Sequence, residues 1–233
     1  MTDLADITDS ILPGLFLALL VGLTLLFLWS PVNKFIAHWR LHTLVSKLGI
    51  KSGKNFYLPD GLGDDIYIER LILQPKRILL VTIKPFRGNI FAAQQIEQWT
   101  QVVGHHSYKF QNPLHQQETD IQALRSLEPK ITIDGLVVFA KGCRFPKGKP
   151  EHVMEYADLK QAGPGTDEIM PAVQEAWDRL MSKVTPAKEM RQSILYRRED
   201  KRRLLIGLLF TIATILYMLW YLESLPLIDK YIP

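Results

Sequence analysis

Three side chains of different chemical type are expected to meet where two neighbouring strands end. Glu69 lies in an apolar run from Ile66 to Leu73, and Thr82 and Lys84 lie in a second run from Ile78 to Lys84. Side chains two positions apart on a strand share a face, so Thr82 and Lys84 point the same way, and Glu69 can reach them from the adjacent strand. A carboxylate can bind Mg²⁺, and a lysine can orient a water molecule and offset the charge of a phosphate. Side chains of these types could together hold a metal ion and a phosphate group, although the threonine supplies no charge.

The elements that would hold these residues include both strands and helices. The run from Ile78 to Lys84 is almost wholly apolar, as expected of a strand buried on both faces. Asn112 and Pro113 suit the N-cap and first residue of a helix. The other expected elements are helices over residues 33–48 and 92–103, strands over 90–91, 108–110 and 131–139, an amphipathic helix capped by Thr166 or Asp167, and a basic helix after Pro186. The pattern predicts an α/β fold.

In this order and spacing, the residues resemble the nuclease-related domain family, a branch of the restriction-endonuclease-like fold. The resemblance covers residues 35–160. It rests on the strand-turn-strand from Ile66 to Lys84 followed by Gly88-x-Ile90, on Trp99, on Phe110-x-Asn112-Pro113-Leu114-x-Gln116, and on the strand from Gly135 to Phe139. The resemblance implies a restriction-endonuclease-like mixed sheet flanked by helices, here bracketed by two transmembrane helices.

Members of that family use an acidic residue on the first strand, Glu-x-Lys on the second, and often a glutamate on the preceding helix. Carried over by position, Lys84 matches the catalytic lysine, Glu69 falls where the family has aspartate, and Thr82 falls at the glutamate. The expected helix over 33–48 contains no glutamate. The resemblance therefore implies a degenerate catalytic site at Glu69, Thr82 and Lys84, with Mg²⁺ as the cofactor if cleavage survives and no cofactor otherwise.

Other side chains could compensate for the missing carboxylate. Glu97, on the expected helix over 92–103, is the best candidate for a second metal ligand beside Glu69, because the acid sometimes moves to a helix in this wider fold. Asp65 at the strand entrance and Gln116 are auxiliary candidates. The simpler interpretation of Glu97 is a solvated residue on a helix.

Two apolar runs bracket the middle of the chain. Ile11 to Trp29 and Leu204 to Leu222 contain no charged residue, and each would be roughly 28 Å long as a helix, close to the hydrocarbon thickness of a bilayer. The first run lacks a basic leader, so we expect an anchor rather than a signal peptide. The expected segments are an extracytoplasmic N-terminus over 1–10, membrane helices over 11–30 and 204–222, a cytoplasmic nuclease-related domain over 31–185, a basic juxtamembrane helix over 186–203, and an extracytoplasmic tail over 223–233.

Charge is distributed unevenly along the chain. The segment 31–203 holds 27 of the 28 Lys and Arg residues and 19 of the 24 Asp and Glu residues, which gives it a net charge of +8. Segments rich in Lys and Arg beside a membrane helix tend to stay in the cytoplasm. The sequence therefore predicts a two-pass protein of a bacterial inner membrane with both termini outside. The single cysteine, Cys143, agrees with a reducing compartment.

Three functions remain open from the sequence. The first is a nuclease-like domain with lost or weakened cleavage that binds DNA or RNA at the membrane, through Lys76, Arg77, Arg87 and Lys147. The second is an active metal-dependent endonuclease with a relocated acidic ligand. The third is a non-catalytic membrane protein that binds a protein partner or a second copy of itself. The positive charge of the middle segment discriminates poorly between these three functions, because the headgroups of the lipid bilayer also attract Lys and Arg.

Overall fold

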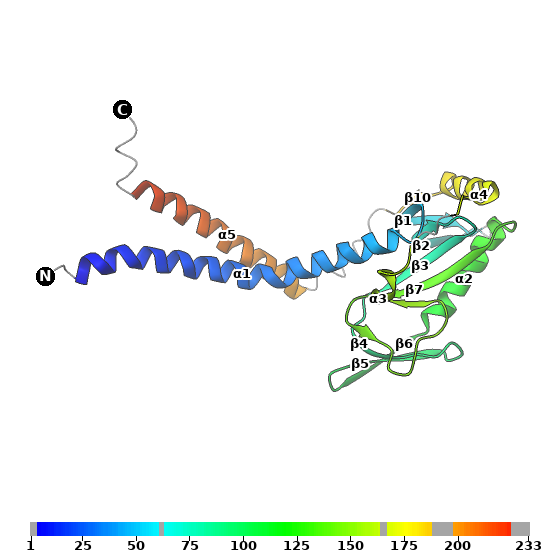
Figure 1. Ribbon diagram of the computed structural model, residues 1–233, viewed down its shortest axis with the longest axis horizontal. Helices are drawn as coiled ribbons and strands as arrows, with labels where there is room; N and C mark the ends of the chain where they lie inside the picture. Colours follow the sequence, from blue (N-terminus) through cyan, green and yellow to red (C-terminus); the bar gives the residue numbers. More distant parts are fainter. Residues whose placement is uncertain (1–3, 61–62, 164–166, 188–197, 225–233) are drawn as a thin grey trace, which may run out of the picture. The chain divides into compact units, whose positions relative to one another are not determined.

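Figure 1 shows the computed structural model of the chain, which describes residues 4–60, 63–163, 167–187 and 198–224. The chain divides into two compact units. The first, here called the helical unit, comprises Met1–His38 and Ser193–Pro233. The second, the sheet unit, comprises Trp39–Gln192 and contains every residue for which a chemical role was predicted.

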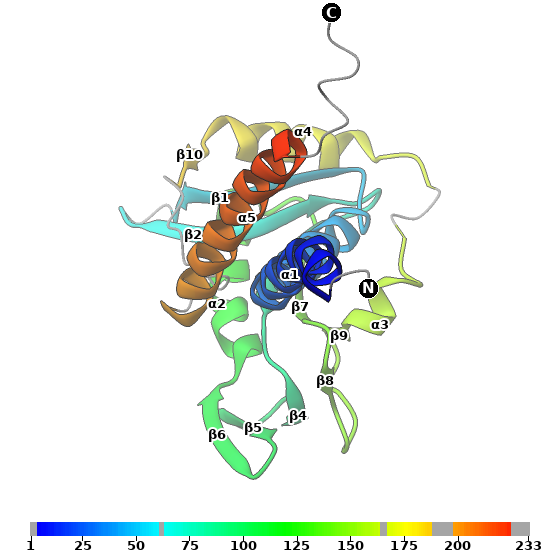
Figure 2. The same ribbon diagram turned by 90° about the vertical axis from the view of Figure 1, so that its left-hand side faces the viewer.

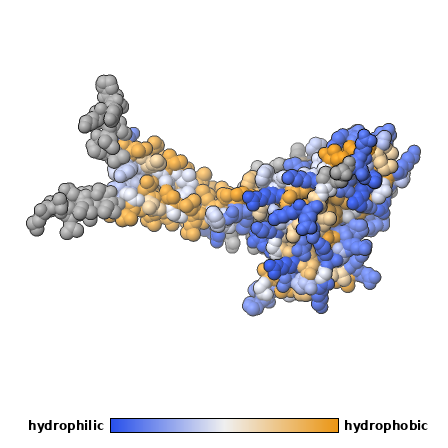
Figure 3. All heavy atoms as spheres, viewed as in Figure 1, coloured by the Kyte–Doolittle hydropathy of each residue, from blue (hydrophilic) through white to orange (hydrophobic). Residues whose placement is uncertain are grey.

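The helical unit contains the first part of α1, Leu4–Ser46, and α5, Arg198–Ser224. α1 continues through Pro31, so the two helices expected over 11–30 and 33–48 are one. By length and composition, both helices can cross a membrane, over Leu12–Ser46 and Lys201–Glu223. Figure 3 shows a mostly hydrophobic surface along both of them.

Close contacts join these two helices inside the helical unit. The Oγ1 atoms of Thr24 and Thr214 lie 3.4 Å apart. Gly207 permits a near approach, because a Cβ atom there would lie 2.5 Å from Cδ2 of Leu28. Small residues and hydroxyl groups at such contacts are typical of helices that pair within a membrane.

A six-stranded mixed sheet forms the centre of the sheet unit, with strand order β10-β1-β2-β3-β7-β9. Pairing is antiparallel from β10 to β3 and parallel from β3 to β9. The strands are β1 Lys51–Pro59, β2 Asp65–Leu73, β3 Ile78–Lys84, β7 Ile133–Phe139, β9 Val153–Glu155 and β10 Thr185–Pro186. The predicted mixed α/β fold is confirmed.

Helices cover both faces of this sheet. α2, Pro113–Leu127, and α4, Pro171–Ser182, pack on one face in a core that includes Trp177. The C-terminal end of α1 and α3, Tyr156–Leu159, pack on the other face in a core that includes Val45. Side chains on both faces of β2, β3 and β7 therefore enter a core, which explains why these strands are nearly continuous apolar runs.

A second sheet, the small sheet, has the strand order β6-β5-β4-β8. Figure 2 shows its strands gathered away from β1 and β2. One of its faces packs on the end of β7 through Ile90, Trp99 and Phe139. The strands are β4 Gly88–Phe91, β5 Gln98–Val103, β6 His106–Gln111 and β8 Cys143–Arg144. The strands expected over 90–91 and 108–110 are confirmed as parts of β4 and β6.

The helix expected over 92–103 is wrong. Its second half is β5, which forms a hairpin with β6 across the two-residue turn Gly104-His105. The two-residue turns of tight hairpins need a residue with a positive φ, and Gly104 has a φ of +61°. Trp99 is fully buried while Gln98 is exposed, and the β-branched residues that follow suit a strand. Glu97 consequently lies in the loop before β5 and not on a helix.

Two further expectations needed correction. The last helix of the sheet unit begins at Pro171 after Met170, not at Asp167, which instead pairs with Lys76 at 2.7 Å. Thr166 lies outside the described residues, as does the start of the basic helix expected after Pro186. β1 was not expected because its first half is polar, yet it pairs with nearly all of β2.

Candidate functional site

Glu69 reaches the end of β3, as the sequence predicted, because the β2–β3 ladder stops just before it. The last paired residues are Arg70 and Val81. Beyond them, Oε2 of Glu69 accepts a hydrogen bond of 2.8 Å from the backbone N–H of Ile83. The carboxylate thus accepts the hydrogen bond that a backbone oxygen of the neighbouring strand would otherwise accept. The donor, Ile83, lies between Thr82 and Lys84 in the sequence.

Burial governs the protonation of this carboxylate. It raises the pKa of Glu69 above its ordinary value, while the Ile83 N–H, Lys84 and Arg70 oppose that shift. The raised pKa means that the protein environment disfavours the charged form of Glu69. A carboxylate that must serve as a metal ligand is needed in that charged form.

Arg70, the next residue, is buried on the side of α1. Its Nη1 donates to Oγ of Ser46 at 2.5 Å and to Oγ of Ser52 at 3.1 Å, and its Nη2 donates to Nδ1 of His42 at 2.8 Å. Burial lowers the pKa of Arg70, and the nearby charge of Glu69 opposes this. The guanidinium therefore joins the C-terminal end of α1 to β2.

A residue of α2 bonds to Thr82 on the face of the sheet opposite to α1. The Nε2 of Gln117 donates to Oγ1 of Thr82 at 3.0 Å, and it also lies 3.1 Å from the backbone oxygens of Leu80 and Leu136. Gln117 is only 2% exposed. At the position where the family has a glutamate, this chain therefore has a hydroxyl group that is bonded to a buried amide.

Gly135 on β7 makes room for that amide. A Cβ atom at this position would lie 2.4 Å from Oε1 of Gln117 and 2.7 Å from Cδ1 of Ile121. Gln117 was not predicted as a site residue. Its signal was present, since it lies four and seven residues before Ile121 and Leu124 and is thus a polar residue on the apolar stripe of α2.

The residues at the end of β3 offer a Mg²⁺ ion one carboxylate, that of Glu69, where the resemblance implies at least two. Such an ion needs oxygen ligands that can turn toward it. One oxygen of Glu69 is held by Ile83, and the hydroxyl of Thr82 is held by Gln117. Nowhere in the described part of the chain do three or more His, Cys, Asp or Glu side chains form a group that could hold a metal ion.

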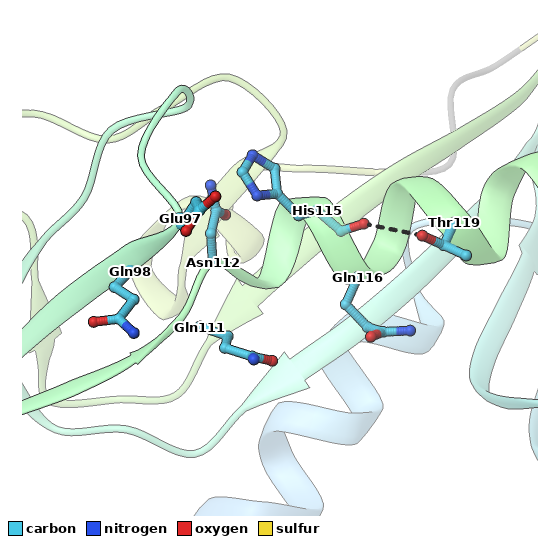
Figure 4. A pocket seen from close by; sticks show the side chains of 7 residues that line it. All are labelled: Glu97, Gln98, Gln111, Asn112, His115, Gln116 and Thr119. Carbon is cyan, nitrogen blue, oxygen red and sulfur yellow. Dashed lines mark hydrogen bonds between the residues drawn. The ribbon is translucent and has the colours of Figure 1, made fainter.

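The auxiliary candidates lie apart from this trio. Glu97 and Gln116 line one polar hollow of about 360 Å³, shown in Figure 4, which Glu69, Thr82 and Lys84 do not line. The hollow is lined by Glu97, Gln98, Gln111, Asn112, His115, Gln116 and Thr119. Asp65 is exposed at the far start of β2, opposite Pro59. The structure therefore does not bring Glu97 or Asp65 to Glu69 as a second ligand.

Asn112 explains why the Asn-Pro element is specific. Its Oδ1 accepts from the N–H of Leu114 at 3.0 Å and caps α2, as predicted. Its Nδ2 donates to the backbone oxygens of Gln94 and Ile96, and its own N–H donates to the oxygen of Glu97. One buried amide thus fixes the helix start against the loop before β5.

The four predicted nucleic-acid contacts fall in two places. Lys76 and Arg77 precede β3, and each pairs with an acid at 2.7 Å, Asp167 and Asp134 respectively. The seven residues of β3, roughly 20 Å in length, separate them from its far end. Arg87 and Lys147 lie beyond that far end, beside the small sheet, where Nζ of Lys147 is 5.9 Å from the ring centroid of Phe91.

Comparison with known proteins identifies one family model and one relative. Residues 34–140 match the family model of the nuclease-related domain. The match includes the end of β3 and the start of α2, so the predicted resemblance is confirmed for this part of the chain. An uncharacterized protein of Bacillus anthracis is 26% identical over 147 residues, which are 57% of this chain and 69% of the relative. No solved structure matches.

Proposed function

We propose that this chain is a membrane-anchored, nuclease-like protein whose nuclease-related domain binds nucleic acid and has lost cleavage. One observation carries the proposal. The polar groups at two of the three inherited catalytic positions have internal partners, because Glu69 accepts from Ile83 and Thr82 accepts from Gln117. A metal ion here would meet one carboxylate, with one oxygen already bonded to Ile83, and a hydroxyl bonded to Gln117 where the family uses a second carboxylate.

The distribution of charge supports binding. Residues 85–111 and 141–150 contain six Lys and Arg residues and a single acid, Glu97. These residues surround the small sheet, and Arg87 and Lys147 are among them. A cluster of cations with almost no acids is the electrostatic signature of contact with phosphates.

The two apolar helices support the anchoring. Each can span a bilayer, and the cluster Arg197 to Arg203 precedes the apolar part of α5. By the preference of Lys and Arg for the cytoplasmic side, we place the sheet unit in the cytoplasm and both termini outside a bacterial inner membrane. Extraction tests this: we expect the protein to stay in the membrane in alkaline carbonate and to leave it only in detergent, and release by carbonate would contradict anchoring.

A nuclease assay tests the loss of cleavage. The full chain in detergent is incubated with single- and double-stranded DNA and with RNA, in Mg²⁺ or Mn²⁺, beside Thr82→Glu and Thr82→Glu/Lys84→Ala. We expect no cleavage by the wild type and weak cleavage by Thr82→Glu, because a second carboxylate then stands next to Lys84. The double variant should lose that gain.

The same assay decides between the proposal and its alternatives. Metal-dependent cleavage by the wild type, abolished by Lys84→Ala, would establish an active endonuclease and overturn the proposal. A chain that neither cleaves nor shows salt-dependent retention of any nucleic acid would leave binding of a protein partner or a second copy as the function.

A further inference from the structure

We propose that the outward face of the small sheet is a platform for single-stranded nucleic acid, where a base stacks on Phe91 and phosphates contact Lys109, Arg144 and Lys147. The proposal rests on the proposed nucleic-acid binding and adds its place and its form. The place is not the inherited catalytic position at the end of β3.

The strand register defines this face. Phe91, Thr100 and Lys109 are directly opposite one another across β4, β5 and β6, so their side chains share a face. Asn89 stands opposite Arg144 of β8 and, two positions from Phe91, lies on the same face. On the other face, Ile90, Trp99 and Phe110 enter the core, while Val103 and Tyr108 near the hairpin turn are exposed. The remaining face therefore carries the side chains that are not needed for packing.

The face is cationic. Lys109 and Arg144 are exposed on it, and Lys147 reaches over it from the loop after β8. The strands β4, β5, β6 and β8, all of them within the described residues, contain no Asp or Glu. Lys149, further along the same loop, differs because it pairs with Asp158. Cations with no acid on the same strands fit the phosphates of a nucleic acid by charge complementarity.

Phe91 supplies the surface for a base. It is partly exposed, and the Nζ atom of Lys147 lies 5.9 Å from its ring centroid, so the face of the ring is turned toward a mobile cation and not toward the core. A ring face that accepts a cation also accepts a base, and the lysine can then move to the adjoining phosphate. Stacking of this kind needs an unpaired base, which favours a single strand over a duplex.

The hollow in Figure 4 extends this face. The opposed pair Gln98 and Gln111 belongs both to the outward face of β5 and β6 and to the lining of the hollow. Asn112, Gln116 and Glu97 line it further. Amide groups both donate and accept hydrogen bonds, as the edges of bases require. A single-stranded nucleic acid that runs from Phe91 along β5 therefore meets amide groups that can form hydrogen bonds with the edge of a base.

The same features argue against a lipid surface as the occupant. A peripheral membrane site combines cations with several large apolar side chains that insert between lipids. Here Phe91 is flanked by Asn89, Thr100 and Lys109, which are polar, and the exposed apolar residues Val103 and Tyr108 belong to the other face of the hairpin. The neighbouring hollow is also polar. The chemistry of the face thus matches bases and phosphates.

Fluorescence anisotropy of a labelled 20-nucleotide single strand tests the proposal on the full chain in detergent. The wild type is compared with Phe91→Ala, Phe91→Trp, Lys109→Gln/Arg144→Gln, Lys76→Gln and Lys84→Ala, each checked for an unchanged circular dichroism spectrum. We expect Phe91→Ala to weaken binding about tenfold and Phe91→Trp to retain it. Lys109→Gln/Arg144→Gln should lower the slope of log Kd against log salt by about 1.4, or about 0.7 for each phosphate that is no longer neutralised. Lys76→Gln and Lys84→Ala should bind as the wild type does.

The outcomes separate this inference from the proposed function. Salt-dependent binding that Phe91→Ala leaves unchanged and Lys84→Ala weakens would place the nucleic acid at the end of β3. That result would overturn the inference and leave the proposed function standing. A wild type that binds no nucleic acid would overturn the proposed function together with the inference. A duplex of the same sequence serves as the matched probe, and equal affinity for duplex and single strand would overturn the stacking mode.

Vesicles of phosphatidylglycerol, compared with phosphatidylcholine, serve as the lipid arm. If Phe91→Ala and Lys109→Gln/Arg144→Gln weaken retention on the anionic vesicles while leaving oligonucleotide binding unchanged, the face is a lipid surface and the inference is wrong. Loss of oligonucleotide binding without any change in vesicle retention would support it.

Discussion

The end of β3 and the outward face of the small sheet use polar residues in opposite ways. At the end of β3, Glu69, Thr82 and Arg70 bond to groups of the protein itself. On the small sheet, Lys109 and Arg144 are exposed on strands without any acid. The first region holds the residues for which the resemblance implied a degenerate nuclease site, and the second has exposed charges on strands without acids.

The difference teaches that residues at positions where a resemblance implies catalysis can serve structure instead. A buried polar group must have a partner, and here the partners are groups of the protein itself. Gln117 fills that role for Thr82, and the N–H of Ile83 fills it for Glu69. Changes at the end of β3 should therefore cost stability, and changes on the small sheet should cost binding.

The largest loss of stability is expected for Gly135→Ala. The added Cβ would lie 2.4 Å from Gln117 and 2.7 Å from Ile121, so the end of β3 must repack at a cost of about 1–3 kcal/mol. Urea unfolding of the full chain in detergent measures it. Gly163→Ala is the matched control, since nothing lies within 4 Å of a Cβ there. Equal stability of the two variants would show that the end of β3 is open.

A loss in the same range is expected for Glu69→Leu. This change leaves the N–H of Ile83 without its acceptor, at a cost of about 1–3 kcal/mol, whereas Glu69→Gln keeps an acceptor and should cost less. If the two variants are equally stable, the bond between Glu69 and Ile83 does not hold the strands together.

Glu69 should also make stability depend on pH. Because burial raises the pKa of its folded form, the contribution is fully present below the unfolded pKa of about 4.3 and is lost as pH rises through the higher folded pKa. Between about pH 4 and pH 7, the wild type should therefore lose more stability than Glu69→Gln, which does not titrate there. Parallel urea midpoints of the two proteins across this range measure the effect, and parallel curves would contradict it.

Thr82→Val should cost about 1 kcal/mol, because it removes one hydrogen bond from a buried amide that retains two others. Thr82→Ser is the control, since it keeps the hydroxyl that Gln117 bonds. Neither change should alter affinity for a single strand, and a change in affinity would mean that the end of β3 binds the nucleic acid after all.

The smallest effect on stability, within about 0.5 kcal/mol, is expected for Lys109→Glu. Its side chain is exposed, and the same change should weaken oligonucleotide binding by placing an acid on the outward face. Urea unfolding and anisotropy on the same preparation check both halves. A large loss of stability would show that the face is covered within the protein.

Reactivity of the two neighbouring residues of β8 checks which face is outward without altering the fold. Cys143 enters the core, where burial and the charge of Glu155 raise its pKa to about 12. At pH 8 it should not react with a maleimide until the protein unfolds. Arg144→Cys in a Cys143→Ser background should react at once, and slow reaction there would contradict the exposure of this face.

Local patterns in the sequence determined much of the fold. The apolar runs gave β2, β3 and β7, and Asn112 with Pro113 gave the start of α2, because these signals depend on residues next to each other. The substitution of Thr82 at a glutamate position was also readable from the sequence. The strand β5 was not predicted: its Trp, Thr and Val residues favour a strand, but its pairing with β6 is not visible in the local pattern.

Only the tertiary structure decided how the inherited positions are used. Gln117 is 35 residues from Thr82, and the N–H of Ile83 is 14 residues from Glu69, so the spacing of neighbouring residues predicts neither hydrogen bond. The sequence by itself determined that Thr82 stands two residues before Lys84 and that cations gather after β3. The folded chain determined that Glu69 and Thr82 are already hydrogen-bonded and that Lys109 and Arg144 share one exposed face, because hydrogen bonds and charge act between neighbours in space.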